Sequence, residues 1–262
     1  MSRRLPTHAL LAASAAAVLA AAAAAPRPGV WFCGDFESGG LEGWGGDLAR
    51  PESAVVVTQP VRKGRHAVRI ELAPGDRAAN KERAELKIGD KAIERLHGRP
   101  GGTMWYGWSL LVPSGYADPP GEQWQILAQW HHRPAGPSAP GERGRVTGAP
   151  PLALHLAGDT LVLIGKTSPR APHRNLGAGA IRRGAWADLV FHIKWSNGSD
   201  GFVEAWLDGR PFTRGKQHGA TLYGPVANYL RLGLYRPKGV PTNNHVFYDE
   251  VCLGESRQAV TP

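Results

Sequence analysis

The stretch QILAQWHH, residues 125–132, decides how this sequence is interpreted. Branched and aromatic residues in a short run predict a β-strand, in which alternate side chains share a face. Gln129 and His131 therefore lie on one face, while Ala128 and Trp130 point the other way, into the expected core. An amide beside an imidazole on an exposed sheet face indicates a functional surface. The alternative is that histidines at a strand end are simply solvated, because one short motif is weak evidence.

Strand-like runs recur along the whole chain. The 262 residues include 34 Gly and 22 Pro, and short alternating runs between turn signals are typical of a sandwich or jelly roll. We predict an all-β fold, a β-jelly roll of the concanavalin A-like type with two antiparallel sheets, as a single domain over residues 26–262. One helical turn is expected at 90–96 and a surface loop at 133–150. The predicted strands are 30–36, 53–58, 66–72, 84–88, 104–112, 123–131, 152–157, 160–164, 186–195, 202–207, 228–235 and 245–253.

The N-terminus has the pattern of an export signal. Arg3 and Arg4 precede an alanine-dominated apolar run, and small residues lead up to Pro26. This pattern predicts a signal peptide over residues 1–25 with cleavage near Ala25, and hence a secreted or periplasmic protein.

The charge of the chain indicates a polyanionic partner. The formal charge is +9, and residues 1–25 contribute two arginines and no acids, which leaves +7 for the remainder. The cations are scattered through strand-like segments without a basic helix or compact run, which argues against nucleic acid. We therefore expect an acidic polysaccharide as partner, no membrane contact after signal cleavage, and a monomer.

The chain contains two cysteines, Cys33 and Cys252, one near each end of the exported part. In an oxidising compartment such a pair predicts a disulfide. It would stabilise the fold by roughly 4–5 kcal/mol at most on the chain-entropy model. Two buried free thiols are the alternative.

Two further segments carry polar residues on an outward face. His192 and Lys194 alternate with apolar residues in one predicted strand, and Glu204 and Trp206 do so in the next. Exposed indoles commonly mark sugar-stacking surfaces, so these residues favour a groove for a carboxylated sugar chain. An ordinary solvated sheet face is the alternative.

The segment YLRLGLYR, residues 229–236, adds a candidate acid or base. Arg231, Gly233 and Tyr235 share a face, and Gly233 leaves room for a ligand or a neighbouring side chain. Beside Gln129 and His131, Tyr235 becomes a candidate for proton transfer, although it could also be an amphipathic rim residue.

Together these segments resemble a known family. RAEL at 83–86, QWH at 129–131 and LGLYR at 232–236 are similar to the three signature strands of jelly-roll polysaccharide lyases, a group that includes alginate lyases, glucuronan lyases and heparin lyase I. DFESG at 35–39, WYGWS at 105–109, the 195–209 hairpin and YDEV at 248–251 resemble the heparin-lyase-I-like branch. The similarity spans nearly all of residues 30–255. Trp130 stands where alginate lyases usually have Ile or Val, which weakens an alginate assignment.

The resemblance implies a secreted lyase that cleaves a uronate polymer by β-elimination. A glucuronan-like polymer is the first expectation, and heparin, heparan or alginate come next. Arg83 and Gln129 would neutralise the substrate carboxylate, His131 would take the C5 proton, and Tyr235, with its pKa lowered in a cationic groove, would protonate the leaving oxygen. In the alternative, Tyr235 performs both proton transfers. Predicted substrate-binding residues are Lys194, His192, Trp206, Glu204, Arg236 and His132, the last pointing to the opposite face unless a bulge turns it.

No cofactor is expected for this chemistry, but a structural calcium ion is. Asp35, Glu37 and Asp249 on the first and last strands supply oxygen ligands of the kind that suit Ca²⁺, and related jelly rolls often carry one there. These acids could equally belong to turns.

Two rival functions use the same scaffold. A glycoside hydrolase needs a close pair of carboxylates, and no Glu-x-Asp-x-Glu triplet occurs in the sequence. A non-catalytic, lectin-like carbohydrate-binding protein would keep the basic groove without requiring Gln129, His131 and Tyr235 together.

Overall fold

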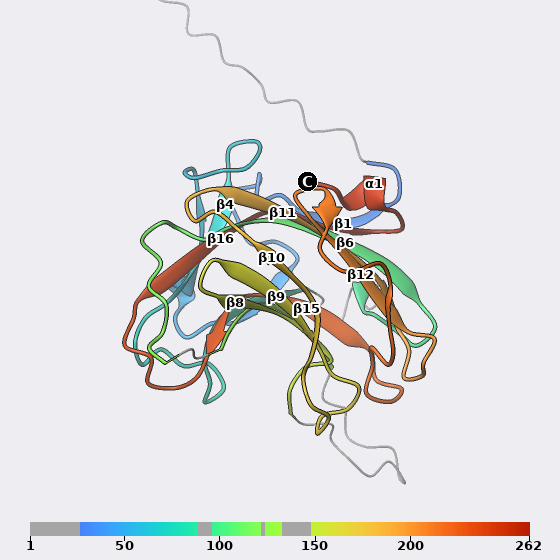
Figure 1. Ribbon diagram of the computed structural model, residues 1–262. Coiled ribbons are helices and arrows are strands. Elements are labelled where there is room, and N and C mark those ends of the chain that lie inside the picture. Colours follow the sequence, from blue (N-terminus) through green and yellow to red (C-terminus); the bar gives the residue numbers. More distant parts are fainter. Residues whose placement is uncertain (1–26, 89–95, 122–123, 133–147) are drawn as a thin grey trace, which may run out of the picture.

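Two antiparallel sheets packed face to face make up most of the molecule (Figure 1). The computed structural model describes residues 27–88, 96–121, 124–132 and 148–262. The nine-stranded sheet has the order β13 (Arg210–Pro211), β12 (Phe202–Leu207), β11 (Trp186–Lys194), β6 (Thr103–Leu111), β16 (Asn244–Gly254), β4 (Ala67–Leu72) and β3 (Ala54–Val57), with β1 (Val30–Gly34) beside β16 and β14 (Gln217–His218) beside β12. The seven-stranded sheet has the order β10 (Arg174–Ala180), β9 (Thr160–Gly165), β8 (Leu152–Ala157), β7 (Gln125–His132), β15 (Asn228–Arg236), β5 (Glu82–Ile88) and β2 (Trp44–Asp47).

The predicted jelly-roll sandwich is confirmed, and each predicted strand has its counterpart. Strands β2, β10, β13 and β14 were not predicted, because their sequences are very short or rich in Gly and Ala rather than in β-branched residues. The predicted signal peptide, the turn at 90–96 and the loop at 133–150 lie wholly or largely outside the described residues. None of the described helices is long and apolar enough to cross a membrane.

The core lies between the sheets and is built by the alternation of each strand. Ala128 and Trp130 of β7 are 1% and 0% exposed, and Phe191 and Ile193 of β11 face them from the other sheet, both 0% exposed. The rings of Trp130 and Phe191 meet at 5.0 Å, edge to face. Because alternate residues of a strand share a face, this packing sends Gln129 and His131 to the outer face of the seven-stranded sheet.

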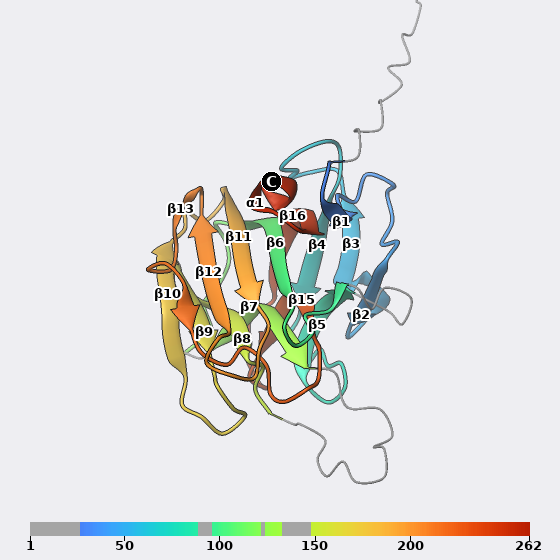
Figure 2. The ribbon, with the colours of Figure 1, turned by 90° about the vertical axis from the view of Figure 1, so that its right-hand side faces the viewer.

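The outer face of the nine-stranded sheet is partly covered by helix α1 (Arg257–Val260), as Figure 2 shows. Its Val260 is fully buried and packs close to Gly107 of β6. A Cβ atom at Gly107 would lie 1.9 Å from the carbonyl oxygen of Val260, so this approach requires glycine. The two outer faces of the sandwich therefore differ, since the described part of the chain places α1 on this sheet alone.

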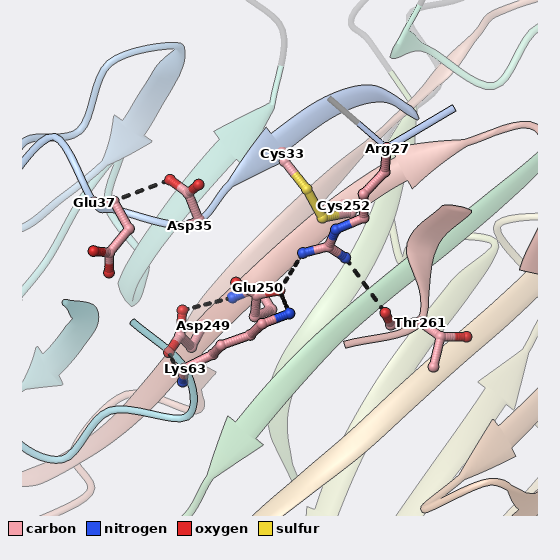
Figure 3. Close-up of a disulfide and its surroundings, with 9 residues drawn as sticks. All are labelled: Arg27, Cys33, Asp35, Glu37, Lys63, Asp249, Glu250, Cys252 and Thr261. Atoms are coloured by element: carbon pink, nitrogen blue, oxygen red, sulfur yellow. Dashed lines mark hydrogen bonds and ion pairs between the residues drawn. A yellow bond between two sulfur atoms is a disulfide. The ribbon is translucent and has the colours of Figure 1, made fainter. Parts of the chain in front are cut away.

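The predicted disulfide between Cys33 and Cys252 is present (Figure 3). The two residues are cross-strand partners in β1 and β16, which are 219 positions apart in sequence. The bond ties the first strand to the last, so β1 is joined to β16 by a covalent bond as well as by backbone hydrogen bonds.

Candidate active site

A cleft of about 720 Å³ lies on the outer face of the seven-stranded sheet. It crosses β5, β15, β7, β8 and β9 and contains all four predicted catalytic residues, Arg83, Gln129, His131 and Tyr235. Residues 148–150 and Trp124 complete its walls. Three segments far apart in the sequence, which carry these four residues, therefore converge on one cavity, as the family resemblance implied.

The strand register explains the convergence. Strand β15 lies between β5 and β7, so that Tyr235 is the cross-strand partner of Arg83. The β15–β7 register shifts between Leu232 and Tyr235, and such bulges re-aim side chains next to functional sites. Gly233 lies in this irregular segment with φ +151°, and a Cβ there would be 2.1 Å from the Ala84 carbonyl oxygen. The space expected at Gly233 is thus filled by the neighbouring backbone and not by a ligand.

His131 is held as a neutral imidazole with one nitrogen defined. Its Nδ1 lies 2.9 Å from the carbonyl oxygen of His132, and because a carbonyl only accepts, Nδ1 carries the proton. The Nε2 atom is then the unprotonated nitrogen. Burial, together with the neighbouring His132, Arg231 and Arg83, lowers the pKa of His131 to about 4. A neutral imidazole with a free lone pair is what a general base requires.

Tyr235 is half-buried between an aromatic ring and a cation. Its ring meets Trp124 edge to face at 5.0 Å, and the Arg83 guanidinium carbon lies 5.0 Å from its centre. Burial raises the pKa of Tyr235 above its usual 10.0, even though Arg83 and Arg231 act in the opposite direction. The expectation of a lowered pKa is therefore wrong, because desolvation outweighs the cations. The phenol keeps its proton and can act as an acid.

A network of ion pairs underlies the β5 side of the cleft. Arg231 Nη1 lies 2.6 Å from Asp47 Oδ2 and 3.2 Å from Glu85 Oε2. Arg83 Nη1 lies 3.3 Å and 3.4 Å from the same two carboxylate oxygens, and Lys87 reaches Asp47 Oδ1 at 2.9 Å. Three cations thus surround two carboxylates, which leaves this part of the site positive.

The same network shifts the titration of its members. Burial alone would raise the pKa of Asp47, but the hydrogen bonds from Lys87 and Arg231 hold it below its ordinary value. Burial alone would lower the pKa of Arg231, but Glu85, Tyr229 and Asp47 raise it further above its ordinary value. The sequence did not assign Asp47 or Glu85 to the site. Strand β2, which carries Asp47, was not predicted, and alternation alone does not distinguish Glu85 from an acid on a solvated sheet face.

Gln129 is fully buried in the cleft floor. Its amide nitrogen donates to Glu85 Oε1, while its Oε1 has no hydrogen-bond partner among the described residues. A buried acceptor without a partner is costly in a folded protein and is explained if a ligand supplies the missing donor. Glu85 therefore fixes the orientation of an amide that is poised to meet the substrate.

His132 also borders the cleft, although the sequence placed it on the opposite face. It is 1% exposed at the end of β7, with its ring 4.3 Å from that of His131 and 5.7 Å from that of Tyr223. Its backbone carbonyl fixes the tautomer of His131, which is a role that no sequence pattern signals.

Four predicted substrate-binding residues lie on the wrong side of the molecule. His192, Lys194, Glu204 and Trp206 belong to β11 and β12 of the nine-stranded sheet and face away from the cleft. Alternation along a strand correctly identified their outward direction, but it does not say which sheet a strand joins. The expectation that they line one groove with Arg83, Gln129, His131 and Tyr235 is therefore wrong.

The aromatic rings on the outer face of the nine-stranded sheet also stack on one another. Trp105 stacks on His192 at 4.0 Å and on Trp206 at 5.7 Å, and the Arg257 guanidinium covers Trp206 at 4.3 Å. A sugar-stacking surface needs an open ring face, so Trp206 does not form the predicted platform.

Arg236 is likewise not available to substrate. It is 2% exposed, its Nε donates to Glu82 Oε1 at 2.8 Å, and its Nη1 donates to Thr242 at 3.2 Å. As the neighbour of Tyr235 it points to the other face of β15, where it forms a buried cross-strand ion pair. The prediction that Arg236 binds sugar acids is wrong.

The three acids predicted to hold calcium accept hydrogen bonds from backbone nitrogens, and a bound calcium ion stays a prediction (Figure 3). Glu37 accepts from the backbone nitrogens of Arg65 and His66, and Asp249 accepts from those of Arg62 and Lys63. Asp35 accepts from the backbone nitrogen of Glu37 at 3.2 Å. Within the ranges that the structure covers, no group of three or more His, Cys, Asp or Glu side chains could hold a metal ion. These carboxylates anchor loops, and no step is assigned to a metal there.

The far wall of the cleft was not predicted. His155 of β8, Lys166 after β9 and His173 before β10 line it. Burial and the nearby His173 lower the pKa of His155 to about 4. Each histidine is more than 20 positions from the nearest motif residue, and only the pairing of β8 and β9 beside β7 brings them to the site.

Comparison with known proteins settles the family. The model of the polysaccharide lyase family matches residues 36–252. The chain belongs to this family. It is therefore a polysaccharide lyase, and the jelly-roll resemblance is confirmed, whereas the heparin-lyase-I-like branch in particular stays a prediction. No match was found among curated proteins.

Solved structures share the fold of this polysaccharide lyase. An endo-β-1,4-glucuronan lyase from the fungus Trichoderma reesei is 22% identical, with a TM-score of 0.65 over 89% of this chain and 98% of its own. The alginate lyase AlgAT5 from Polysaccharide Lyase family 7 is 13% identical, with a TM-score of 0.54 over 82% and 95%. The catalytic domain of a glycoside hydrolase family 131 protein from Coprinopsis cinerea is 11% identical, with a TM-score of 0.58 over 89% and 97%. The fold thus hosts both eliminating and hydrolysing enzymes, so the reaction must be argued from the site.

Proposed function

We propose that the protein is a secreted lyase that cleaves a β-linked glucuronate polymer by β-elimination in the cleft of the seven-stranded sheet. The observation that carries this proposal is the convergence of a neutral imidazole, a protonated phenol, a guanidinium and an amide in one cavity. Each of these groups matches one requirement of the reaction.

The first requirement is to acidify the proton at C5 of the uronate. This proton is only weakly acidic while the adjacent carboxylate keeps its full charge. Arg83 neutralises that carboxylate and stabilises the charge that develops as C5 loses its proton. Gln129 assists with the second N–H of its amide, since the first is donated to Glu85. Glu85, which contacts both side chains, keeps these donors in place before substrate arrives.

The second requirement is a base and an acid on the reacting atoms. His131 Nε2 takes the C5 proton, the electron pair of the C5–H bond forms the C4–C5 double bond, and the C4–O bond breaks. Tyr235 then gives its proton to the leaving oxygen. The depressed pKa of His131 and the raised pKa of Tyr235 put both groups in the protonation state that this assignment requires.

The nature of the polymer is inferred from the charge of the cleft. Lys81, Arg83 and Lys166 are the cations among its described lining residues, and they are spread over the two ends. Such spacing suits one carboxylate per sugar better than the dense sulfates of heparin. The similarity to a glucuronan lyase and Trp130 in place of the Ile or Val usual in alginate lyases support the same choice.

Export is the second part of the proposal. The basic and alanine-rich start of the chain supports cleavage near Ala25. The disulfide between Cys33 and Cys252 supports folding in an oxidising compartment. Mass spectrometry of the protein recovered from the producing cells would find a mature N-terminus near Pro26, and an intact Met1 on the exported protein would contradict cleavage.

Incubation with glucuronan, alginate and heparin tests the reaction and the polymer together. We expect glucuronan to yield the ultraviolet absorbance of unsaturated uronate fastest. Faster elimination on heparin or alginate would overturn the choice of polymer. New reducing ends without absorbance would indicate hydrolysis, and retention of a polymer without cleavage would indicate a lectin.

A further inference from the structure

The cleft extends well past the four proposed catalytic residues. From β15, which carries Tyr235, it crosses β7 and β8 to reach β9. Neighbouring strands lie about 4.8 Å apart, so three spacings place the far wall roughly 14 Å from the Tyr235 strand. A sugar residue held there is not the residue that reacts.

The far wall carries a cation that has no carboxylate partner among the described residues. Lys166 Nζ donates to the Pro169 carbonyl oxygen at 3.1 Å and forms no ion pair with any described residue. The described lining of the cleft contains no Asp or Glu. The β5 side is different, because Asp47 and Glu85 lie beneath its cations.

Two imidazoles accompany Lys166 on this wall. The rings of His155 and His173 lie 6.4 Å apart, His173 is exposed, and His155 is mostly buried. A neutral imidazole offers one donor and one acceptor, which suits the hydroxyl groups of a sugar. A cation flanked by such groups matches a sugar that carries both a carboxylate and hydroxyls.

We propose that Lys166 and His173, together with His155, form a second uronate-binding subsite. It holds the carboxylate of a polymer residue that is separated from the cleaved bond by at least one sugar. The inference rests on the proposed function, since it assumes that the cleft takes a uronate polymer. It adds that affinity for long chains depends on a lysine remote from the chemistry.

Steady-state kinetics of Lys166→Gln on glucuronan of different lengths tests this subsite. Loss of one or two partly exposed charge contacts should raise KM for long chains about three- to tenfold, with kcat unchanged. The shortest oligomers that are still cleaved should show little change in KM, because they do not reach the wall. Lys166→Arg should restore the KM for long chains, and His173→Gln should give a smaller increase than Lys166→Gln.

Lys63→Gln is the matched control. Lys63 is an exposed lysine near the disulfide, on the other side of the molecule, and pairs with Glu250 at 3.6 Å (Figure 3). Its KM should equal that of the wild type. An unchanged KM for Lys166→Gln on long chains, or equal increases on short and long chains, would overturn the subsite.

A binding measurement separates this inference from the proposed function. Migration of Tyr235→Phe through a native gel that contains glucuronan measures retention without turnover. Adding Lys166→Gln to that variant should reduce its retention, while adding Lys63→Gln should not. If the wild-type protein cleaved no uronate polymer the proposed function would fail, whereas equal retention of the variants with and without Lys166→Gln would refute the subsite alone.

Discussion

The two outer faces of the sandwich carry similar residues, but only the face of the seven-stranded sheet carries the cleft described above. On the nine-stranded sheet, the ring of Trp105 stacks on those of His192 and Trp206, and the Arg257 guanidinium covers Trp206. On the same face, Lys194 pairs with Asp200 at 2.9 Å. On the seven-stranded sheet, the imidazole of His131 and the phenol of Tyr235 border a cleft of about 720 Å³. Rings and cations therefore do not make a binding site by themselves. What separates the faces is whether the polar groups satisfy one another or remain available to a ligand.

The same distinction holds within the seven-stranded sheet. Its β5 side has cations already matched with Asp47 and Glu85, which fixes the geometry around the proposed reaction centre. Its β9 side has Lys166, which pairs with no carboxylate in the part of the chain that the structure describes. Fixed ion pairs near the proposed reaction centre are expected if the β5 side of the cleft acts on a sugar. A lysine without a carboxylate partner among the described residues is expected if the β9 side only binds the polymer chain.

The largest expected effect is that of removing the Tyr235 hydroxyl. Tyr235→Phe should lower kcat about 10²- to 10⁴-fold, because general acid catalysis is lost, while affinity for glucuronan is retained. Ultraviolet absorbance of the product measures the rate. A near-normal kcat for Tyr235→Phe would contradict the role of Tyr235 as the general acid.

Glu85→Gln comes next and tests preorganisation. It removes the charge that faces Arg83 and Arg231 and that accepts from Gln129. We expect kcat/KM to fall roughly 10- to 100-fold, mostly through kcat, since buried partners lose about 1–3 kcal/mol of interaction.

Glu82→Gln is the matched control on the same strand. Glu82 is buried on the other face of β5 and pairs with Arg236. Breaking that pair should lower the free energy of unfolding by about 3–5 kcal/mol and leave kcat of the folded protein unchanged. Equal losses of kcat in both variants would contradict a positioning role for Glu85.

The pH dependence of kcat/KM should reflect the buried His131. The base must be unprotonated, and its pKa of about 4 lies below the ordinary 6.5. Activity is therefore present above pH about 4 and falls about tenfold per unit below it. Circular dichroism at each pH identifies any unfolding, which the same depressed pKa promotes as pH falls from 6.5 toward 4.

The acid limb must also be assigned to one histidine, because the pKa of His155 is lowered to about 4 as well. The pH profile of His155→Gln should keep the acid limb near pH 4, whatever the value of kcat/KM at its plateau. An acid limb near pH 6.5 in the wild type would contradict the depressed pKa of His131. Loss of the limb in His155→Gln would assign it to His155 instead.

The smallest expected effects are on the nine-stranded sheet. Lys194→Gln and Trp206→Phe should change kcat and KM by about twofold or less, as substitutions away from a site do. Assays on long glucuronan chains measure both constants. A KM increase as large as that of Lys166→Gln would show that the two outer faces are not as different as their contacts indicate.

Local sequence carried much of the fold and the proposed chemistry. Alternation in QILAQWHH placed Trp130 in the core and Gln129 and His131 outside. Asp208 and Gly209 have φ +49° and +75°, as is typical of an Asp-Gly pair in a two-residue hairpin turn. Alternation depends only on neighbouring residues, so it can be read from the chain alone. It could not place His192 and Trp206, because both outer faces of a sandwich have the same period.

The sequence by itself determined which apolar residues alternate toward the core and the positions of twelve of the sixteen described strands. Through the family motifs it also grouped Arg83, Gln129, His131 and Tyr235. Only the tertiary structure decided which sheet each strand joins and that Arg236 pairs with Glu82. It also decided that Asp47, from a weakly patterned strand, reaches Arg231, and that Lys166 has no carboxylate partner within the described ranges. The physical reason is range. Burial and alternation are set by adjacent residues, whereas ion pairing and desolvation depend on contacts between strands that may lie more than a hundred positions apart.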